Sequence, residues 1–203
     1  MLFVLAVCFV AGASSSFAAV ITLEQSDGHN YGNYAGGCWK LSDVGFTVSG
    51  GTLTQQVYLK SVSYKRNRVG SGGTPGYLWL KVFEGNNGGN GTFVGISSNK
   101  LDFGALQDGE VGTWTFDNLV LDKDTVYSFV ASSTNDNSNP DAVMRMKTSH
   151  PNDTLTSGNL LFADDTKPDY DSDPWVKVEV ENVPEPATIG LLILGGLLFK
   201  SRK

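Results

Sequence analysis

Short segments in which apolar and polar residues alternate constrain the fold of this chain more than any other feature. YLWLKVFE (77–84) has an aliphatic residue at every second position, and WVKVEVEN (175–182) has valine at every second position. Because successive side chains of a β-strand point to opposite faces, this alternation predicts two half-buried antiparallel strands. In 77–84 the aliphatic face is expected to form core. The opposite face carries Trp79, Lys81 and Phe83, which places Trp79 outward or beneath a loop.

The rest of the body shows the same organisation more weakly. Turn-forming sequences such as GSGGTPG, EGNNGGNG and TNDNSNPD separate the candidate strands, and no helix-period pattern interrupts them. Short strands joined by such turns predict an all-β fold, an antiparallel β-sandwich of jelly-roll-like type, in one domain over 19–182. The weaker strands are expected at 20–24, 44–49, 57–65, 92–98, 111–117, 125–132, 142–147 and 159–163.

The charge of the body limits its partners. Residues 19–182 hold 12 Lys and Arg against 20 Asp and Glu, a net charge of −8. Nucleic-acid binding needs clustered positive charge, so no nucleic-acid partner is expected. Of the two cysteines, Cys8 falls in the leader described below, which leaves Cys38 alone in the mature chain. A buried, inert thiol is expected there in preference to an intermolecular disulfide.

The last 21 residues, VPEPATIGLLILGGLLFKSRK, differ from the body. Pro184 and Pro186, on either side of Glu185, lack an N–H and fix φ, so no strand continues through them. The thirteen residues that follow are uncharged, and as a helix they would span about 20 Å. They lack the polar face of a core helix, so a short single transmembrane helix is preferred. Its residues are Ala187, Thr188, Ile189, Gly190, Leu191, Leu192, Ile193, Leu194, Gly195, Gly196, Leu197, Leu198 and Phe199.

A basic cluster closes the chain. Lys200, Arg202 and Lys203 are expected to stay in the cytoplasm, which puts the body outside. The Pro-Glu-Pro motif, the apolar run and the basic end, in this order, resemble the PEP-CTERM sorting signal of Gram-negative bacteria over 183–203. The resemblance implies recognition of 184–186 by a membrane-embedded sorting peptidase, the exosortase, and a cut near that motif. It also implies transient anchoring in the inner membrane, then release to the cell surface or extracellular matrix.

The N-terminal segment MLFVLAVCFVAGASSSFAA is consistent with export. An apolar run over 2–13 precedes SFA (16–18), which supplies small residues at the −3 and −1 positions of a signal-peptidase site. A signal helix over 1–18 is therefore predicted, with cleavage by signal peptidase after Ala18 or Ala19. No Lys or Arg precedes the apolar run. The alternative, a hydrophobic first strand, is disfavoured because the run does not alternate.

The order of three segments in the body, VYLKSVSY, GTPGYLWLKVFEGN and WTFDNLVLDKDTVYSFV, is similar to sandwich modules found upstream of bacterial surface-anchor signals. Those modules have no established catalytic residues to carry over. The histidines, His29 and His150, lie in no HExxH or nucleophile motif, and we expect them to be exposed loop residues. No enzymatic activity is expected.

Carboxylates on the predicted strands provide an alternative to that expectation. Glycoside hydrolysis needs two carboxyl groups facing each other across a cleft. Glu179 and Glu181 lie on the same side of one strand, about 7 Å apart, although solvated edge charges explain them equally well. The other carboxylates considered are Glu84, Asp102 and Glu110.

The acidic segment DDTKPDYDSDP is a candidate calcium loop. Asp169, Asp171 and Asp173 match the first three ligand positions of such a loop. Pro174 replaces the expected glycine and the closing glutamate is absent, so the segment is not an EF-hand. A looser Ca²⁺ site remains as the alternative to a solvated acidic loop, and no other cofactor is expected.

Aromatic rings form the last candidate site. Trp39, Tyr77 and Trp79 are the candidate carbohydrate contacts, since exposed rings stack on the apolar faces of sugars; packing beneath loops is the alternative. The sequence thus predicts an exported, non-enzymatic β-sandwich of the cell surface or extracellular matrix. A module that binds extracellular polysaccharide is the runner-up, and a glycoside hydrolase is least favoured. The other rings considered are Tyr31, Tyr34, Tyr64 and Trp114.

Overall fold

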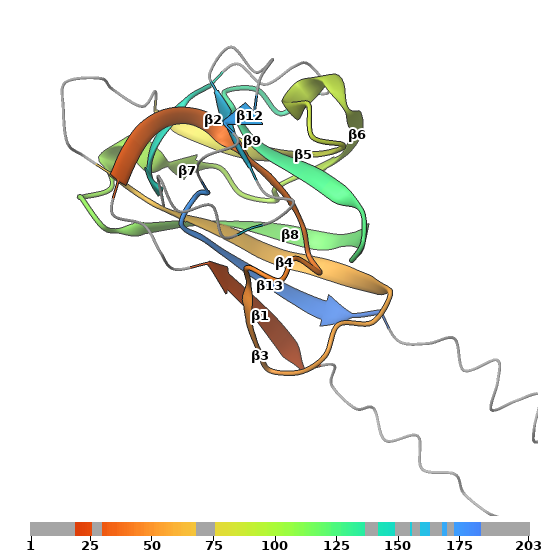
Figure 1. Cartoon of the computed structure of the whole chain (residues 1–203). Helices are drawn as coiled ribbons and strands as arrows, with labels where there is room; N and C mark the ends of the chain where they lie inside the picture. The colour runs from red at the N-terminus through yellow and green to blue at the C-terminus, as the bar shows by residue number, and fades with distance from the viewer. Residues whose placement is uncertain are drawn as a thin grey trace, which may run out of the picture.

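The chain folds as an all-β sandwich in which two antiparallel sheets pack face to face (Figure 1). This confirms the predicted all-β class and the antiparallel β-sandwich. The predicted signal helix (1–18) and transmembrane helix (187–199) lie outside the described residues, and no helix within them is long and apolar enough to cross a membrane. The computed structural model describes residues 19–25, 30–67, 76–136, 142–148, 155, 159–162, 168–169 and 173–183.

Among the described residues, the first sheet has five strands in the order β3-β1-β13-β4-β8. On β13 the valines Val176, Val178 and Val180 are buried, while Lys177 and Glu179 between them are partly exposed. The predicted alternation of 175–182 is therefore confirmed. The strands are β1 (Val20–Gln25), β3 (Thr47–Ser49), β4 (Gln56–Lys65), β8 (Val111–Asp122) and β13 (Val176–Asn182).

The second sheet follows the order β12-β11-β2-β9-β5-β6, with β10 paired to β2 and β7 paired to β5. Short 3-10 turns, η1 (Gly88–Asn90) and η2 (Phe103–Ala105), follow β5 and β7. The strands are β2 (Asn30–Lys40), β5 (Tyr77–Glu84), β6 (Thr92–Ile96), β7 (Leu101–Asp102), β9 (Val126–Ser132), β10 (Met144–Thr148), β11 (Asn159–Phe162) and β12 (Pro168–Asp169).

Strand β2 was not among the predicted strands, because its sequence NYGNYAGGCWK is rich in glycine and lacks alternation. Its pairing with β9 explains one of these glycines, Gly36. β2 pairs with β9, β10 and β11, and a Cβ at Gly36 would collide with the backbone carbonyl of Phe129 on β9. The close approach of two backbones therefore selects glycine at a position where a strand pattern would place a larger residue.

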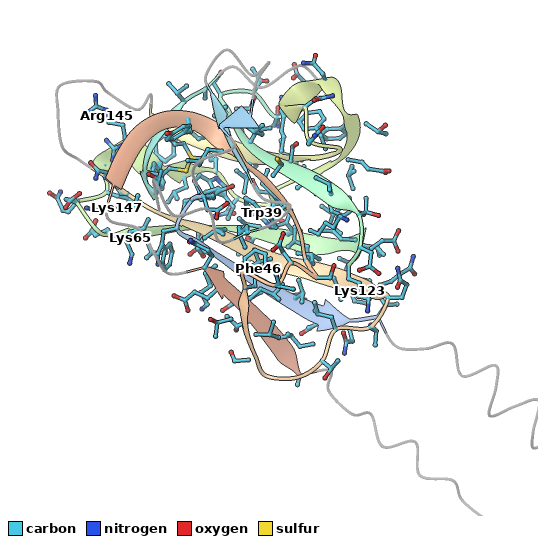
Figure 2. The ribbon with its side chains drawn as sticks, in the orientation of Figure 1. Trp39, Phe46, Lys65, Lys123, Arg145 and Lys147 are labelled. Atoms are coloured by element: carbon cyan, nitrogen blue, oxygen red, sulfur yellow. The ribbon has the colours of Figure 1, made fainter. Side chains whose placement is uncertain are left out.

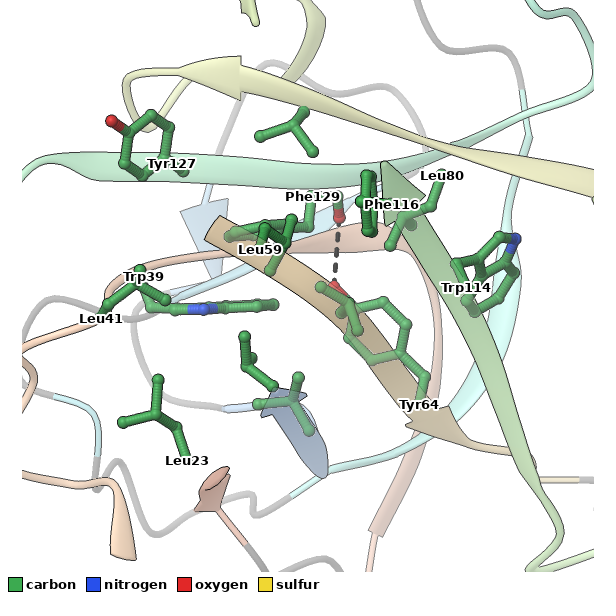
Figure 3. Packing of buried hydrophobic residues seen from close by; sticks show 14 of the residues in the cluster. Leu23, Trp39, Leu41, Leu59, Tyr64, Leu80, Trp114, Phe116, Tyr127 and Phe129 are labelled. Atoms are coloured by element: carbon green, nitrogen blue, oxygen red, sulfur yellow. Dashed lines mark hydrogen bonds between the residues drawn. The ribbon is translucent and has the colours of Figure 1, made fainter. Parts of the chain in front are cut away.

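Aromatic rings fill the main core between the sheets (Figure 3). Trp39 of β2 stacks on Phe129 with 4.5 Å between ring centroids. Hydrogen bonds from side chains also join the sheets through this core: Tyr64 Oη donates to the Phe129 carbonyl (3.2 Å; Figure 3), and Trp114 Nε1 donates to the Leu78 carbonyl (2.9 Å). Burial raises the pKa of the Tyr64 hydroxyl well above its usual value, so it remains a donor.

A second, smaller apolar cluster lies on the outer face of the β2-containing sheet. It comprises Ala35, Cys38, Phe83, Val130 and Leu161. The segment after β5 folds over this face, since the Gly88 N–H donates to Ser128 Oγ and η1 contacts β2, β5 and β9. Lys81 and Phe83 are only 0 % and 2 % exposed. The prediction that 77–84 is a half-buried strand is thus wrong for its second face, while the prediction of a buried Cys38 is confirmed.

The first and last strands of the body are neighbours. Val20, where β1 begins, pairs with Glu181 near the end of β13. The Val183 N–H donates to the Gln56 carbonyl, so the described chain stays attached to β4 up to its last residue. Both ends of the body therefore lie side by side at one end of the sandwich (Figure 1).

Candidate functional site

The three predicted carbohydrate contacts, Trp39, Tyr77 and Trp79, do not form one surface. Trp39 is 0 % exposed and packs against Phe129 and Phe46 in the core (Figure 2). It cannot meet a carbohydrate at the surface, and this corrects the prediction for that residue. Tyr64 and Trp114 are likewise fully buried. The error follows from the unrecognised strand β2, which carries Trp39 into the space between the sheets.

Tyr77 and Trp79 remain near the surface. They occupy alternate positions of β5, so both side chains lie on the outer face of the sheet. Tyr77 is 61 % exposed, and Trp79 is partly exposed. The ammonium of Lys100 lies 5.1 Å from the Tyr77 ring centroid. Two of the three predicted carbohydrate contacts therefore share one accessible face.

Polar groups continue this face along the sheet. Lys81, two positions beyond Trp79, directs Nζ to Thr134 Oγ1 (3.2 Å) and lies 3.6 Å from Asp136 Oδ1. Thr134 Oγ1 in turn donates to Asp136 Oδ1 at 2.9 Å. A buried ammonium thus orients a hydroxyl and an exposed carboxylate beside partly exposed rings, which is a donor and acceptor set suited to sugar hydroxyls.

Two of the candidate carboxylates, Glu179 and Glu181, are engaged in ion pairs. Glu179 Oε1 lies 2.7 Å from Lys177 Nζ, and Ser61 Oγ donates to its Oε2 at 2.9 Å. The hydrogen bond from Lys177 lowers the pKa of Glu179 below its ordinary value. Glu181 pairs with Lys60 at 3.3 Å. A glycosidase acid needs a raised pKa, so the environment of Glu179 does not suit that role.

Asp173 shows what one acidic-loop residue does. Its side chain is 0 % exposed, and Oδ2 accepts a hydrogen bond from the Leu155 N–H at 2.8 Å. Asp171 and the side chain of Asp169 lie outside the described residues, as do His29 and His150. Among the residues that are described, no group of three or more His, Cys, Asp or Glu is placed to hold a metal. Calcium binding by this loop stays a prediction.

Comparison with protein-family models, with curated proteins and with solved structures finds no match.

The end of the sandwich where β13 finishes holds features that the sequence did not reveal. Lys123 lies at this end (Figure 2). Its N–H donates to the Gln55 carbonyl, and the N–H of Val183 donates to the neighbouring Gln56 carbonyl. A pocket of about 380 Å³ opens beside it. Pro184, the first residue of the predicted sorting motif, follows directly after Val183. The pocket is lined by Leu41, Ser42, Asp43, Val48, Gly51, Thr52, Leu53 and Lys123.

Asn182, the last residue of β13, is the second feature at this end. Its side chain binds the loop over 52–54, which is distant in sequence. No local pattern predicts such a contact, because it depends on how two remote segments meet. The only sequence signal is an amide side chain placed directly before the Val-Pro that ends the body.

Proposed function

We propose that this chain is an exported, non-enzymatic β-sandwich protein of the cell surface or extracellular matrix, delivered by its two terminal segments. In this account 1–18 is a signal helix removed by signal peptidase, and 187–199 is a short transmembrane helix. The segment 183–203 acts as a PEP-CTERM-type signal read by an exosortase-like peptidase. The sandwich itself is of jelly-roll-like type.

The pairing of Val20 with Glu181 is the observation that supports this proposal best. It attaches both terminal segments to one end of a single folded body. The rest of the sandwich can then fold on the outer side of the membrane while one end faces the lipid. Neither terminal segment contributes to a strand that the structure describes, which is the arrangement that export followed by release requires.

Cell fractionation tests the proposal. Replacing Pro184, Glu185 and Pro186 with alanine should keep the protein in the membrane fraction, while the parent is released. A matched control replaces Asn86 and Asn87, two exposed loop residues, with alanine and should leave release unchanged. Equal release of the motif variant and the parent would refute recognition by a sorting peptidase.

Carbohydrate binding is the second candidate function, and the shared outer face of Tyr77 and Trp79 favours it. Rings on this face lie beside the Lys81, Thr134 and Asp136 network, so they combine stacking surface with hydrogen-bonding groups. Affinity electrophoresis of the body in gels containing extracellular polysaccharide tests it. Retardation should disappear in Tyr77→Ala with Trp79→Ala.

A control for that experiment is Tyr58→Ala, because Tyr58 is a partly exposed ring on the other sheet. It should retain the mobility of the parent. If neither parent nor variant is retarded by any polysaccharide of the producing cells, or if Tyr58→Ala abolishes retardation equally, the outer face of β5 is not a carbohydrate site.

A further inference from the structure

The side chain of Asn182 binds the loop over 52–54 as a neighbouring β-strand would. Its Oδ1 accepts from the Thr54 N–H (2.9 Å) and from Thr54 Oγ1 (3.1 Å), and its Nδ2 donates to the Thr52 carbonyl (2.9 Å). The Thr54 hydroxyl has a single proton, which is shared between Asn182 Oδ1 and the nearer Gln56 carbonyl at 2.7 Å. The Val183 N–H donates to that same carbonyl. The last two described residues are thus hydrogen-bonded to the segment over 52–56.

The same arrangement occurs elsewhere in the molecule. Asn99 Oδ1 accepts from the Thr115 N–H (2.7 Å) and from Thr115 Oγ1 (3.2 Å), and its Nδ2 donates to the Thr113 carbonyl (3.1 Å). Each asparagine side chain makes three hydrogen bonds to a Thr-x-Thr segment, 52–54 for Asn182 and 113–115 for Asn99. Asn99 therefore provides a matched control, because it makes the same bonds far along the chain from the exit of the tail.

The position of β13 makes the Asn182 contact consequential. β13 lies between β1 and β4, so both of its edges are hydrogen-bonded, with Asn182 itself paired to Val57. A peptidase must draw several residues around the scissile bond out of any sheet, and it therefore cuts folded proteins at segments that open. Residues before Pro184 can supply that length only if the central strand detaches.

We propose that Asn182 fixes the boundary between folded body and tail, so that peptidases acting on the folded protein cut only C-terminal to Val183. This inference rests on the proposed function for its cellular meaning, which concerns the sorting peptidase. Only residues 184–186 separate Val183 from the predicted transmembrane helix, and they extend at most about 11 Å. The partner must therefore be a peptidase that accepts a folded sandwich directly at the membrane surface and needs little extended chain before its cut.

Limited proteolysis of the purified full chain in detergent tests the inference without any sorting peptidase. Proteinase K is added, and intact mass spectrometry identifies the C-terminus of the resistant fragment. For the parent and for Asn99→Ala we expect fragments that end at Val183 or later. For Asn182→Ala we expect bonds between 180 and 183 to be cut about tenfold faster, because cleavage follows the population of the opened form.

Two results would overturn the inference. One is a parent fragment trimmed back into β13 as fast as the tail is lost. The other is an Asn182→Ala variant with the same boundary and rate as the parent. Thr54→Val keeps the backbone hydrogen bond and removes the hydroxyl, so it should show a smaller increase in the cleavage rate. This variant also replaces Asn182→Ala if that variant does not fold. An unchanged cleavage rate in Thr54→Val would then count against the inference.

The outcome is separable from that of the proposed function. Alanine replacement of 184–186 should change release from cells and leave the proteolytic boundary at Val183. If release is unaffected but the boundary depends on Asn182, the sorting proposal fails and the boundary stands. If release requires 184–186 but the proteolytic boundary does not depend on Asn182, the sorting proposal stands and the inference about Asn182 fails.

Discussion

The two sheets of the sandwich differ in how much of each is covered. The five-stranded sheet keeps one face partly solvated, with Lys177 and Glu179 on β13 forming an ion pair there. The β2-containing sheet is also covered over part of its outer face, where Lys81 and Phe83 are buried, while Tyr77 on the same face stays exposed. Alternation of apolar and polar residues therefore describes both faces of β13 in the first sheet. In the second sheet it identifies only the inner face of β5, because close backbone approach at Gly36 and the segment over the outer face set other residues.

Phe83→Ala gives the largest expected effect and tests whether the outer face of β5 is a true core. Phe83 is buried against Phe93 with 5.5 Å between ring centroids, and removing such a ring costs about 3 kcal/mol of unfolding free energy. Tyr58→Ala, on the partly exposed face of β4, should cost less than about 1 kcal/mol. Urea unfolding measures both. Equal losses of unfolding free energy in the two variants would show that the outer face of β5 is no more buried than that of β4.

Gly36→Ala should cause the next largest loss of unfolding free energy. The added Cβ would meet the fixed carbonyl of Phe129, and separating β2 from β9 costs about 2–3 kcal/mol. Gly95→Ala is the matched change, because its nearest obstacle is the flexible side chain of Leu119, and its expected cost is about 1 kcal/mol or less. Thermal unfolding ranks the two variants. If Gly95→Ala is the more damaging, backbone approach does not explain the glycine-rich strand.

Tyr64→Phe tests the polar link between the sheets. It removes the hydrogen bond from Tyr64 Oη to the Phe129 carbonyl while keeping the ring, so we expect a loss of about 1 kcal/mol. Chemical denaturation monitored by tryptophan fluorescence provides the measurement. A variant as stable as the parent would show that apolar packing alone holds the sheets together at this point.

The smallest effect concerns pH and the solvated face. The pKa of Glu179 lies below its ordinary value of 4.5 in the folded protein, chiefly because Lys177 donates to it. Its stabilising contribution is therefore present above about pH 4.5 and is lost as pH falls through the lowered pKa. Melting temperatures at pH 7 and pH 3 should differ less in Glu179→Gln than in the parent. An identical pH dependence in both proteins would contradict the ion pair with Lys177.

The sequence was informative where one physical rule acted alone. Alternation predicted β5 and β13 and the buried valines, and Cys38 was correctly expected inside. Alternation did not predict β2, because Gly36 is required by the close approach of the Phe129 backbone on β9. Trp39 was misplaced for the same reason.

The candidate sites divide in the same way. Tyr77 and Trp79 could be assigned to one face from their spacing on β5. The Lys81 network and the contacts of Asn182 could not be predicted, since each joins segments that meet only in the folded chain. Residues 184–186 are a prediction from their resemblance to a sorting signal.

Under the proposed function, a folded body is exported and then released from its C-terminal segment. The most direct test is the intact mass of the protein recovered outside Gram-negative cells that carry a sorting peptidase. We expect a species that begins at Ala19 or Val20 and ends between Val183 and Ala187. Recovery of a species that retains residues 187–203, or retention of the whole chain in the cytoplasm, would contradict it.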